Sequence, residues 1–152
     1  DGPKVLEFNA RFGDPETQVY LTRLENDLVE LLDACVSGTL KDIPLRWSPQ
    51  PSVCVVLASG GYPGPYTKGH PISGLESVSA LPNVKVFHAG TAFSDGAFVT
   101  NGGRVLGITA WGETLEQAQE TAYAAADLIE FEGVQLRRDI GAKAIGHGSP
   151  LS

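Results

Sequence analysis

Three polar side chains near the start of the sequence, Glu7, Asn9 and Arg11, carry groups that bind metal ions and phosphates. In an extended strand they lie on one face, because residues two positions apart point the same way. Mg²⁺ prefers hard oxygen ligands that it shares with substrate phosphates, and a guanidinium binds a phosphate directly. The spacing is therefore that of a metal–nucleotide site. A solvated strand face with an ion pair between Glu7 and Arg11 explains the same residues.

A second candidate site follows directly at residues 13–16, where the sequence GDPE has the form of a helix start. Asp14 is a typical N-cap residue, Pro15 suits the first helical position, and Glu16 is favourable near the positive end of the helix dipole. Backbone N–H groups at a helix N-terminus bind anions, so a carboxylate or phosphate can lie between them and Arg11. Ordinary capping by Asp14 explains the same residues and does not exclude that role.

The other polar clusters give weaker signals. Residues 60–69 contain four glycines and two prolines but lack the Gly-Lys-Ser/Thr spacing of a phosphate loop. We interpret them as an ordered surface loop, in which Tyr66 and Lys68 are the side chains available to a ligand. The three histidines do not converge in sequence and predict no nucleophile–base set. We expect His88 to be a hydrogen-bonded residue at a strand end.

The elements that position the first two candidate sites are a strand and a helix. Residues 4–9 largely alternate between apolar and polar types, which predicts a half-buried strand. An apolar stripe with helical spacing predicts one helix from about residue 15 to residue 36, ending at Gly38. Residues 38–52 are rich in Pro and lack periodicity, which is typical of a connector. The stripe consists of Leu21, Leu24, Leu28, Leu31, Leu32 and Cys35.

The rest of the sequence predicts a small β-rich unit with one packed helix. An Asp-Gly pair marks a hairpin turn between two of its strands. Thr114 and Gln117 have the spacing of a capping box and open a helix over residues 114–130, whose alanine-rich side suits close packing on a sheet. Residues 134–145 are expected to add one short strand and a last turn. Strands are expected at residues 53–58, 84–88, 92–93, 97–99 and 104–110.

The composition is that of a folded, acidic protein. Of the 152 residues 42% are hydrophobic and 19% are charged, which excludes wholesale disorder and allows a buried core. The formal net charge is −7, from 11 Lys+Arg against 18 Asp+Glu, and no basic run occurs. This charge argues against binding to nucleic acid or to an anionic membrane surface.

The sequence also bears on location. The longest apolar run, Val53–Ala58, is far shorter than the roughly 20 residues that cross a bilayer, and no leader pattern opens the chain. We therefore expect a cytoplasmic protein that does not span a membrane. In that compartment Cys35 and Cys54 are expected to be buried thiols without a disulfide. The sequence has no Met and opens with a turn at residues 1–3, so we expect a piece of a longer protein.

Residues 5–18, with the sequence VLEFNARFGDPETQ, resemble the metal-binding strand and following helix of the phosphoribosylamine–glycine ligases. That family consists of ATP-grasp enzymes of purine biosynthesis. The resemblance continues in the family's order through four further segments and covers the chain to about residue 145. These segments are GGYPG at 60–64, VFHAGT at 86–91, TNGGRVL at 100–106 and RDIG at 138–141.

The resemblance implies an α+β fold in two parts. Residues 1–50 would form the C-terminal end of an ATP-grasp domain, as a strand plus a helix. Residues 51–146 would form the small β-rich C-terminal domain of the ligase with one packed helix, followed by a frayed tail at residues 147–152. The family's N-terminal domain and most of its nucleotide pocket are not within this chain.

The resemblance also implies an activity and roles for single residues. The carboxylate of glycine would be phosphorylated by ATP, and the acyl phosphate would be attacked by the amine of 5-phosphoribosylamine, giving glycinamide ribonucleotide, ADP and phosphate. Glu7 and Asn9 would hold Mg²⁺ or Mn²⁺ on the ATP phosphates, and Arg11 would stabilise charge on the phosphoryl group or the acyl phosphate. The amides at Gly13 and Asp14 would receive the glycine carboxylate.

Two other interpretations stay open at this point. The chain alone can be a non-catalytic folding or interaction module that associates with the upstream part of the enzyme. Another ATP-grasp carboxylate–amine ligase would also share Glu7, Asn9 and Arg11. It would have no reason to share the segments at residues 60–64 and 100–106.

Overall fold

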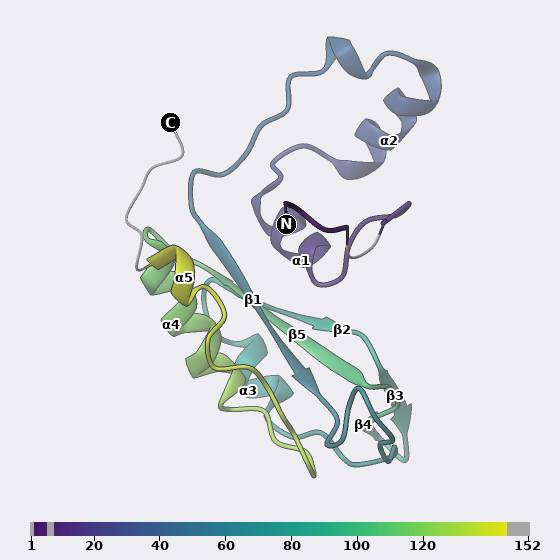
Figure 1. Cartoon of the computed structure of the whole chain (residues 1–152), viewed down its shortest axis with the longest axis vertical. Coiled ribbons are helices and arrows are strands. Elements are labelled where there is room, and N and C mark those ends of the chain that lie inside the picture. Colours follow the sequence, from purple (N-terminus) through teal and green to yellow (C-terminus); the bar gives the residue numbers. More distant parts are fainter. Residues whose placement is uncertain (1, 6–7, 146–152) are drawn as a thin grey trace.

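The computed structural model describes residues 2–5 and 8–145, and its centre is a three-stranded antiparallel sheet (Figure 1). β5 (Arg104–Trp111) is the middle strand, where Ile108 lies opposite Val55 of β1 (Ser52–Ala58) and Val86 of β2 (Val84–His88). All three strands are predicted by the sequence, and the structure confirms them. In spatial order they are β1, β5 and β2.

A two-stranded hairpin follows β2 along the chain and consists of β3 (Thr91–Ser94) and β4 (Ala97–Thr100). At its turn Asp95 and Gly96 have φ angles of 50° and 83°. Both angles are positive, as a tight hairpin turn requires, and Asp-Gly pairs adopt them readily. The hairpin predicted from the sequence is therefore confirmed.

One face of the sheet is covered by α4 (Leu115–Ala126), which packs on β1 and β5 (Figure 1). The side-chain oxygen of Thr114 accepts a hydrogen bond from the backbone N–H of Gln117 at 3.2 Å, as the predicted cap requires. The predicted helix ends earlier than residue 130, because the N–H groups of Leu128 and Ile129 bond to carbonyls only three residues back. The buried core includes Val53, Val55, Leu57, Val105, Ile108, Ala118, Ala122, Ala125 and Ile129.

Three short features complete this part of the chain. α3 (Leu75–Ser79) contacts β2 and is not predicted by the sequence, and α5 (Ala142–Ile145) is the predicted last turn. The strand expected within residues 134–145 is reduced to one antiparallel bridge between Ala58 and Gln135. The register of β1 shifts at Leu57 and Ala58, and such an irregularity interrupts a ladder. With these elements the α+β class is confirmed.

The helix predicted over residues 15–36 is instead two helices, α1 (Glu16–Arg23) and α2 (Leu28–Ser37). Asn26 breaks the helix, since its side chain accepts a hydrogen bond from the N–H of Arg46 at 2.6 Å and donates one to the carbonyl of Pro44 at 3.2 Å. Asp27 then caps α2 by accepting from two backbone N–H groups. The predicted end is correct, because Gly38 has a left-handed φ of 71°.

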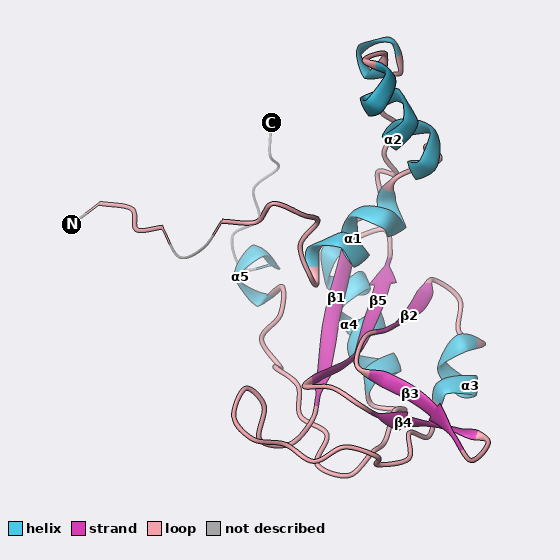
Figure 2. Cartoon of the chain, turned by 90° about the vertical axis from the view of Figure 1, so that its right-hand side faces the viewer, coloured by secondary structure: helices cyan, strands magenta, loops and turns pink. Residues whose placement is uncertain are grey.

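The strand predicted over residues 4–9 is absent from the part of it that the structure describes. Val5 is 71% exposed and Phe8 is 91% exposed, and no strand lies beside them among the described residues. A strand depends on a neighbour for its hydrogen bonds, so an alternating pattern alone does not form one. The described residues from Phe8 onward lead into α1 without forming a helix or strand of their own (Figure 2).

The apolar stripe along the two helices is only partly buried. Leu31 is buried, but Leu32 is 46% exposed, and Cys35 is exposed rather than buried as expected. Cys54 is buried, and neither cysteine forms a disulfide. α2 projects away from the sheet (Figure 2), which explains why its apolar side chains stay accessible. No helix in the described ranges is long and apolar enough to cross a bilayer.

Candidate functional site

The residues selected from the sequence that the structure describes lie on the arm that leads into α1. Asn9 and Arg11 are exposed on this arm. Gly13 and Asp14 are half-buried where the arm meets the sheet, while Glu7 lies outside the described residues. Arg11 donates one hydrogen bond to the neighbouring backbone carbonyl at 2.8 Å. A guanidinium has five N–H donors, so Arg11 keeps donors for an anion.

The start of α1 differs from the predicted cap. The N-cap residue is Pro15, which makes no side-chain capping hydrogen bond, so Asp14 is not the cap. The Asp14 carboxylate instead accepts a hydrogen bond from the side-chain amide of Gln18 at 3.1 Å. The Asp14 side chain therefore bonds to a side chain of α1 rather than to the free backbone N–H groups at the start of the helix.

Gly13 lies directly under the side chains of the first helical turn. Its carbonyl accepts hydrogen bonds from the backbone N–H of Thr17 at 3.1 Å and from the Thr17 hydroxyl. The carboxylate of Glu16 turns back over Gly13, where any added Cβ would overlap it. A carboxylate of the chain itself thus occupies the place where the sequence predicts the carboxylate of a ligand.

Arg104, at the first position of β5, joins this segment to the sheet across 90 positions of sequence. Its Nη1 donates to the backbone carbonyl of Asp14 at 2.7 Å, and its Nη2 lies 3.7 Å from the Asp14 carboxylate. Arg104 lies in one of the segments that resemble the ligase family, but the sequence predicts no role for it. No short-range signal links it to Asp14, since the pairing depends on how α1 packs on β5.

α1 and α4 lie on opposite faces of the sheet. Val53, Val55 and Leu57 belong to the core with α4, whereas the alternating residues Cys54 and Val56 face the other way. On this second face the chain leaves a cavity of about 480 Å³ beside β1. A smaller one of about 210 Å³ adjoins Pro15. Both cavities are close to the Asp14–Arg104 contact, because Arg104 lines the first and Pro15 lines the second.

Other polar groups serve the fold. The Nδ1 atom of His88 lies 3.0 Å from the hydroxyl of Thr91, as expected for a hydrogen-bonded residue at a strand end. His70 contacts Thr67 and Glu132 in the surface loops. Burial raises the pKa of the Cys54 thiol, against the opposing effect of a hydrogen bond to a neighbouring threonine, so the thiol stays protonated and unreactive at neutral pH.

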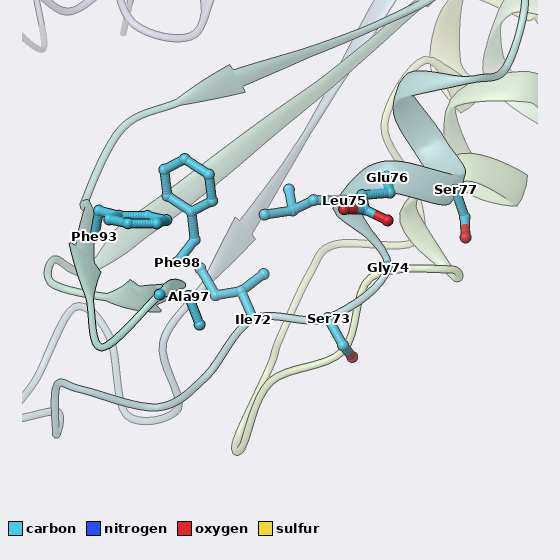
Figure 3. A pocket seen from close by; sticks show the side chains of 10 residues that line it. Ile72, Ser73, Gly74, Leu75, Glu76, Ser77, Phe93, Ala97 and Phe98 are labelled. Atoms are coloured by element: carbon cyan, nitrogen blue, oxygen red, sulfur yellow. The ribbon is translucent and has the colours of Figure 1, made fainter.

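A further hollow of about 410 Å³ lies between α3 and the β3–β4 hairpin (Figure 3). Figure 3 shows Leu75 extending toward Phe98, which with Phe93 forms one wall. Among the described residues that line it, Glu76 carries the one charge. The hollow shares no lining residue with the cavities beside β1, so it is separate from the candidate site.

Comparisons with known proteins connect this arrangement to one enzyme. The phosphoribosylamine–glycine ligase of Rhodopirellula baltica is 54% identical over 145 residues, which cover 95% of this chain and 33% of the relative. The same enzyme from Pseudomonas aeruginosa is 54% identical over 143 residues, covering 94% and 33%. The crystal structure of phosphoribosylamine–glycine ligase from Thermotoga maritima superposes with a TM-score of 0.66 at 38% identity, covering 90% of this chain and 33% of that one.

The chain thus spans about a third of the length of the curated relatives that it matches. These matches confirm the resemblance inferred from the sequence segments. The family model described as phosphoribosylglycinamide synthetase, C domain, matches residues 52–143, which include the whole sheet and α4. Because that match extends over more than half of its residues, the chain belongs to the phosphoribosylglycinamide synthetase C-domain family.

Proposed function

We propose that this chain supplies the C-terminal third of an ATP-dependent ligase of purine biosynthesis. The ligase joins glycine to 5-phosphoribosylamine through an acyl phosphate and releases glycinamide ribonucleotide, ADP and phosphate. The observation that carries the proposal is the 54% identity to a phosphoribosylamine–glycine ligase across 95% of the chain. In this proposal residues 1–50 end the ATP-grasp domain, residues 51–146 form the C-terminal domain, and residues 147–152 are a tail. The location is cytoplasmic, in agreement with two free cysteines.

The metal of the proposed reaction is Mg²⁺ or Mn²⁺, held on the phosphates of ATP. Bound there, such an ion neutralises charge on the transferring phosphoryl group. Glu7 and Asn9 fit it chemically, because a carboxylate and an amide oxygen are the hard ligands that these ions prefer. No group of three or more His, Cys, Asp or Glu side chains lies close enough to bind a metal in the described ranges. A carboxylate oxygen and an amide oxygen suit an ion that takes its other ligands from phosphate and water.

Arg11 and the segment after it act on the substrates in this proposal. The exposed guanidinium of Arg11 stabilises charge on the phosphoryl group or the acyl phosphate. The amides at Gly13 and Asp14 receive the carboxylate of glycine. Glu16, whose carboxylate lies over Gly13, must turn away for glycine to bind, which exposed side chains do on a nanosecond timescale.

The partner that completes the site is the upstream two thirds of the ligase. α1, α2 and residues 40–47 enclose an entirely apolar groove of about 210 Å³, with Tyr20, Leu21 and Trp47 exposed at its edge. Exposed apolar surface of this kind is typical of an interface. The relatives are about three times as long as this chain, so the proposed occupant of the groove is the remainder of the ligase. Alone, the chain is expected to be a non-catalytic module.

A chimera tests the proposal. This chain replaces the matching third of the Rhodopirellula baltica ligase, and ADP release is measured with glycine and 5-phosphoribosylamine. We expect turnover that depends on both substrates, at least a hundredfold loss for Glu7→Ala with an unchanged circular dichroism spectrum, and no loss for the matched control Glu30→Ala on exposed α2. An inactive chimera contradicts the assigned reaction, and an active Glu7→Ala variant contradicts the metal site.

A further inference from the structure

The cavity of about 480 Å³ beside β1 has walls that the fold holds in place. The ring of Tyr62 lies against Gly103, where a Cβ would overlap it. The side-chain amide of Gln135 donates to the carbonyl of Tyr62 at 2.7 Å, so these two parts of the cavity wall are tied together. The bridge between Ala58 and Gln135 fixes the second wall to β1 with bonds of 2.9 and 3.0 Å. The cavity is therefore pre-formed, as ligand sites usually are.

The lining of this cavity combines an apolar floor with two cations. Val56 and Ala58 of β1 form the floor. Arg104 and Arg137 are the charged residues among those described in the lining, and both are positive. Asp14 and Asp139 pair with them from outside the lining, and each guanidinium has five N–H donors, of which the aspartate contacts use two. Donors remain on both arginines for a doubly charged anion such as a phosphate monoester.

The cavity extends toward the candidate site. The neighbouring cavity of about 210 Å³ shares Val56 and Arg137 with the first one, and its lining includes Pro15. The residue before Pro15 is Asp14, which Arg104 holds in place. A trough thus runs along β1 from Tyr62 to the segment that receives glycine in the proposed function.

We propose that this trough binds the phosphorylated sugar substrate of the ligase, with its phosphate between Arg104 and Arg137 and its amine toward Gly13 and Asp14. The inference rests on the proposed function, because the substrate is that of the assigned reaction. The apolar floor packs against the carbon face of the ribose. The phosphate anchors the end of the substrate that does not react, so the binding energy positions the amine for attack.

The first test is kinetic and uses the chimera with Arg137→Gln, Arg104→Gln and the matched control Arg138→Gln. Arg138 pairs with Asp127 much as Arg137 pairs with Asp139, but it does not line the cavity. We expect KM for 5-phosphoribosylamine to rise at least about tenfold in the first two variants, as for one lost charge-assisted hydrogen bond. KM for ATP and glycine stays within about twofold in Arg137→Gln, and Arg138→Gln leaves all three values unchanged.

The inference is overturned if the KM for 5-phosphoribosylamine is unchanged in Arg137→Gln and Arg104→Gln, or if all three KM values rise together in Arg137→Gln. Either result leaves the reaction itself intact, so failure of the trough is distinguishable from failure of the proposed function.

The second test does not depend on turnover. The 152-residue chain is titrated with ribose 5-phosphate, which carries a hydroxyl where the substrate carries its amine, and followed by heteronuclear NMR. We expect saturable shifts at Tyr62, Arg104 and Gln135 that are lost in Arg137→Gln and kept in Arg138→Gln. Unphosphorylated ribose is expected to cause none. Shifts confined to other regions, or equal binding of ribose and ribose 5-phosphate, contradict the assignment even if the chimera is inactive.

Discussion

The two parts of this chain differ in where their apolar side chains lie. In residues 52–145 the core is closed, and Leu57 and Ile108 are fully buried. Among the described residues before β1, Phe8 is 91% exposed and Val36 is 89% exposed. Residues 52–145 bury their apolar side chains among themselves. The described residues before β1 leave apolar side chains accessible, and exposed apolar surface of this kind is typical of an interface.

The largest expected effect tests whether the core of residues 52–145 carries the stability of the chain. Leu57→Ala removes a fully buried side chain and is expected to lower the free energy of unfolding by about 2–5 kcal/mol. Leu32→Ala in α2 is the matched control, since Leu32 is 46% exposed, and it is expected to cost less than about 1 kcal/mol. Urea unfolding monitored by circular dichroism measures both. Equal losses would show that α2 belongs to the same core.

A second prediction concerns how far the two parts unfold together. Thr114→Ala removes the cap of α4 and is expected to lower the free energy of unfolding of residues 52–145 by about 1 kcal/mol. Asp27→Ala removes the cap of α2 and is expected to leave that free energy unchanged. The sequence has two tryptophans, Trp111 in β5 and Trp47 beside the apolar groove. Fluorescence in Trp47→Phe and Trp111→Phe backgrounds therefore follows each part separately. Coincident transitions that shift equally with either cap variant would contradict the comparison.

The same comparison explains what could be predicted from the sequence. In residues 52–145 the local signals and the burial agree. The apolar run of β1, the Asp-Gly turn at Asp95 and the cap at Thr114 are all found where they are expected. In residues 2–50 the signals depend on distant groups. Asn26 divides the predicted helix because it bonds to Pro44 and Arg46, and no helical periodicity reports that contact.

For the same reason, only part of the candidate site can be predicted from the sequence. The segment from Asn9 to Asp14 is local, so residue types and spacing select it. The role of Asp14 at the junction comes from Arg104, and the walls of the trough come from Tyr62 and Gln135, which are far apart in sequence. These contacts arise from the order of the strands and from the face on which α1 packs. Composition and periodicity do not contain that information.

A third prediction tests the junction between the two parts. Asp14→Asn weakens the contact with Arg104, whose charges are 3.7 Å apart and more than a third exposed, so the loss of global stability is expected to be below about 1 kcal/mol. Because Asp14→Asn removes one of the contacts that hold α1 on the sheet, amide exchange in α1 is expected to become faster, while exchange in β5 is unchanged. The hydroxyl contact between Thr22 and Ser52 at 2.9 Å remains and limits the effect. Slower or unchanged exchange in α1 would show that Asp14 does not hold the junction.

The smallest expected effect comes from an exposed ion pair within residues 52–145. Hydrogen bonds from Arg138 hold the pKa of the Asp127 carboxyl below its usual value, against a small opposing effect of desolvation. A group whose pKa is lower in the folded state stabilises the fold above its unfolded pKa of about 3.9. That contribution is lost as the pH falls through the lower, folded value. The pair should therefore stabilise the chain at pH 7 and contribute nothing in strong acid.

Asp127→Asn is expected to lower the midpoint of thermal unfolding slightly at pH 7, and the difference from the unmodified chain should shrink as the pH falls below about 4. It should also shrink in 1 M NaCl, because salt screens an exposed pair with side chains 60% and 51% accessible. With Trp111 as the probe, the measurement reports the closed core that contains α4, next to which Asp127 lies. A difference that stays constant from pH 7 to pH 2.5 and in high salt would mean that Asp127 acts through the end of α4 and not through its charge.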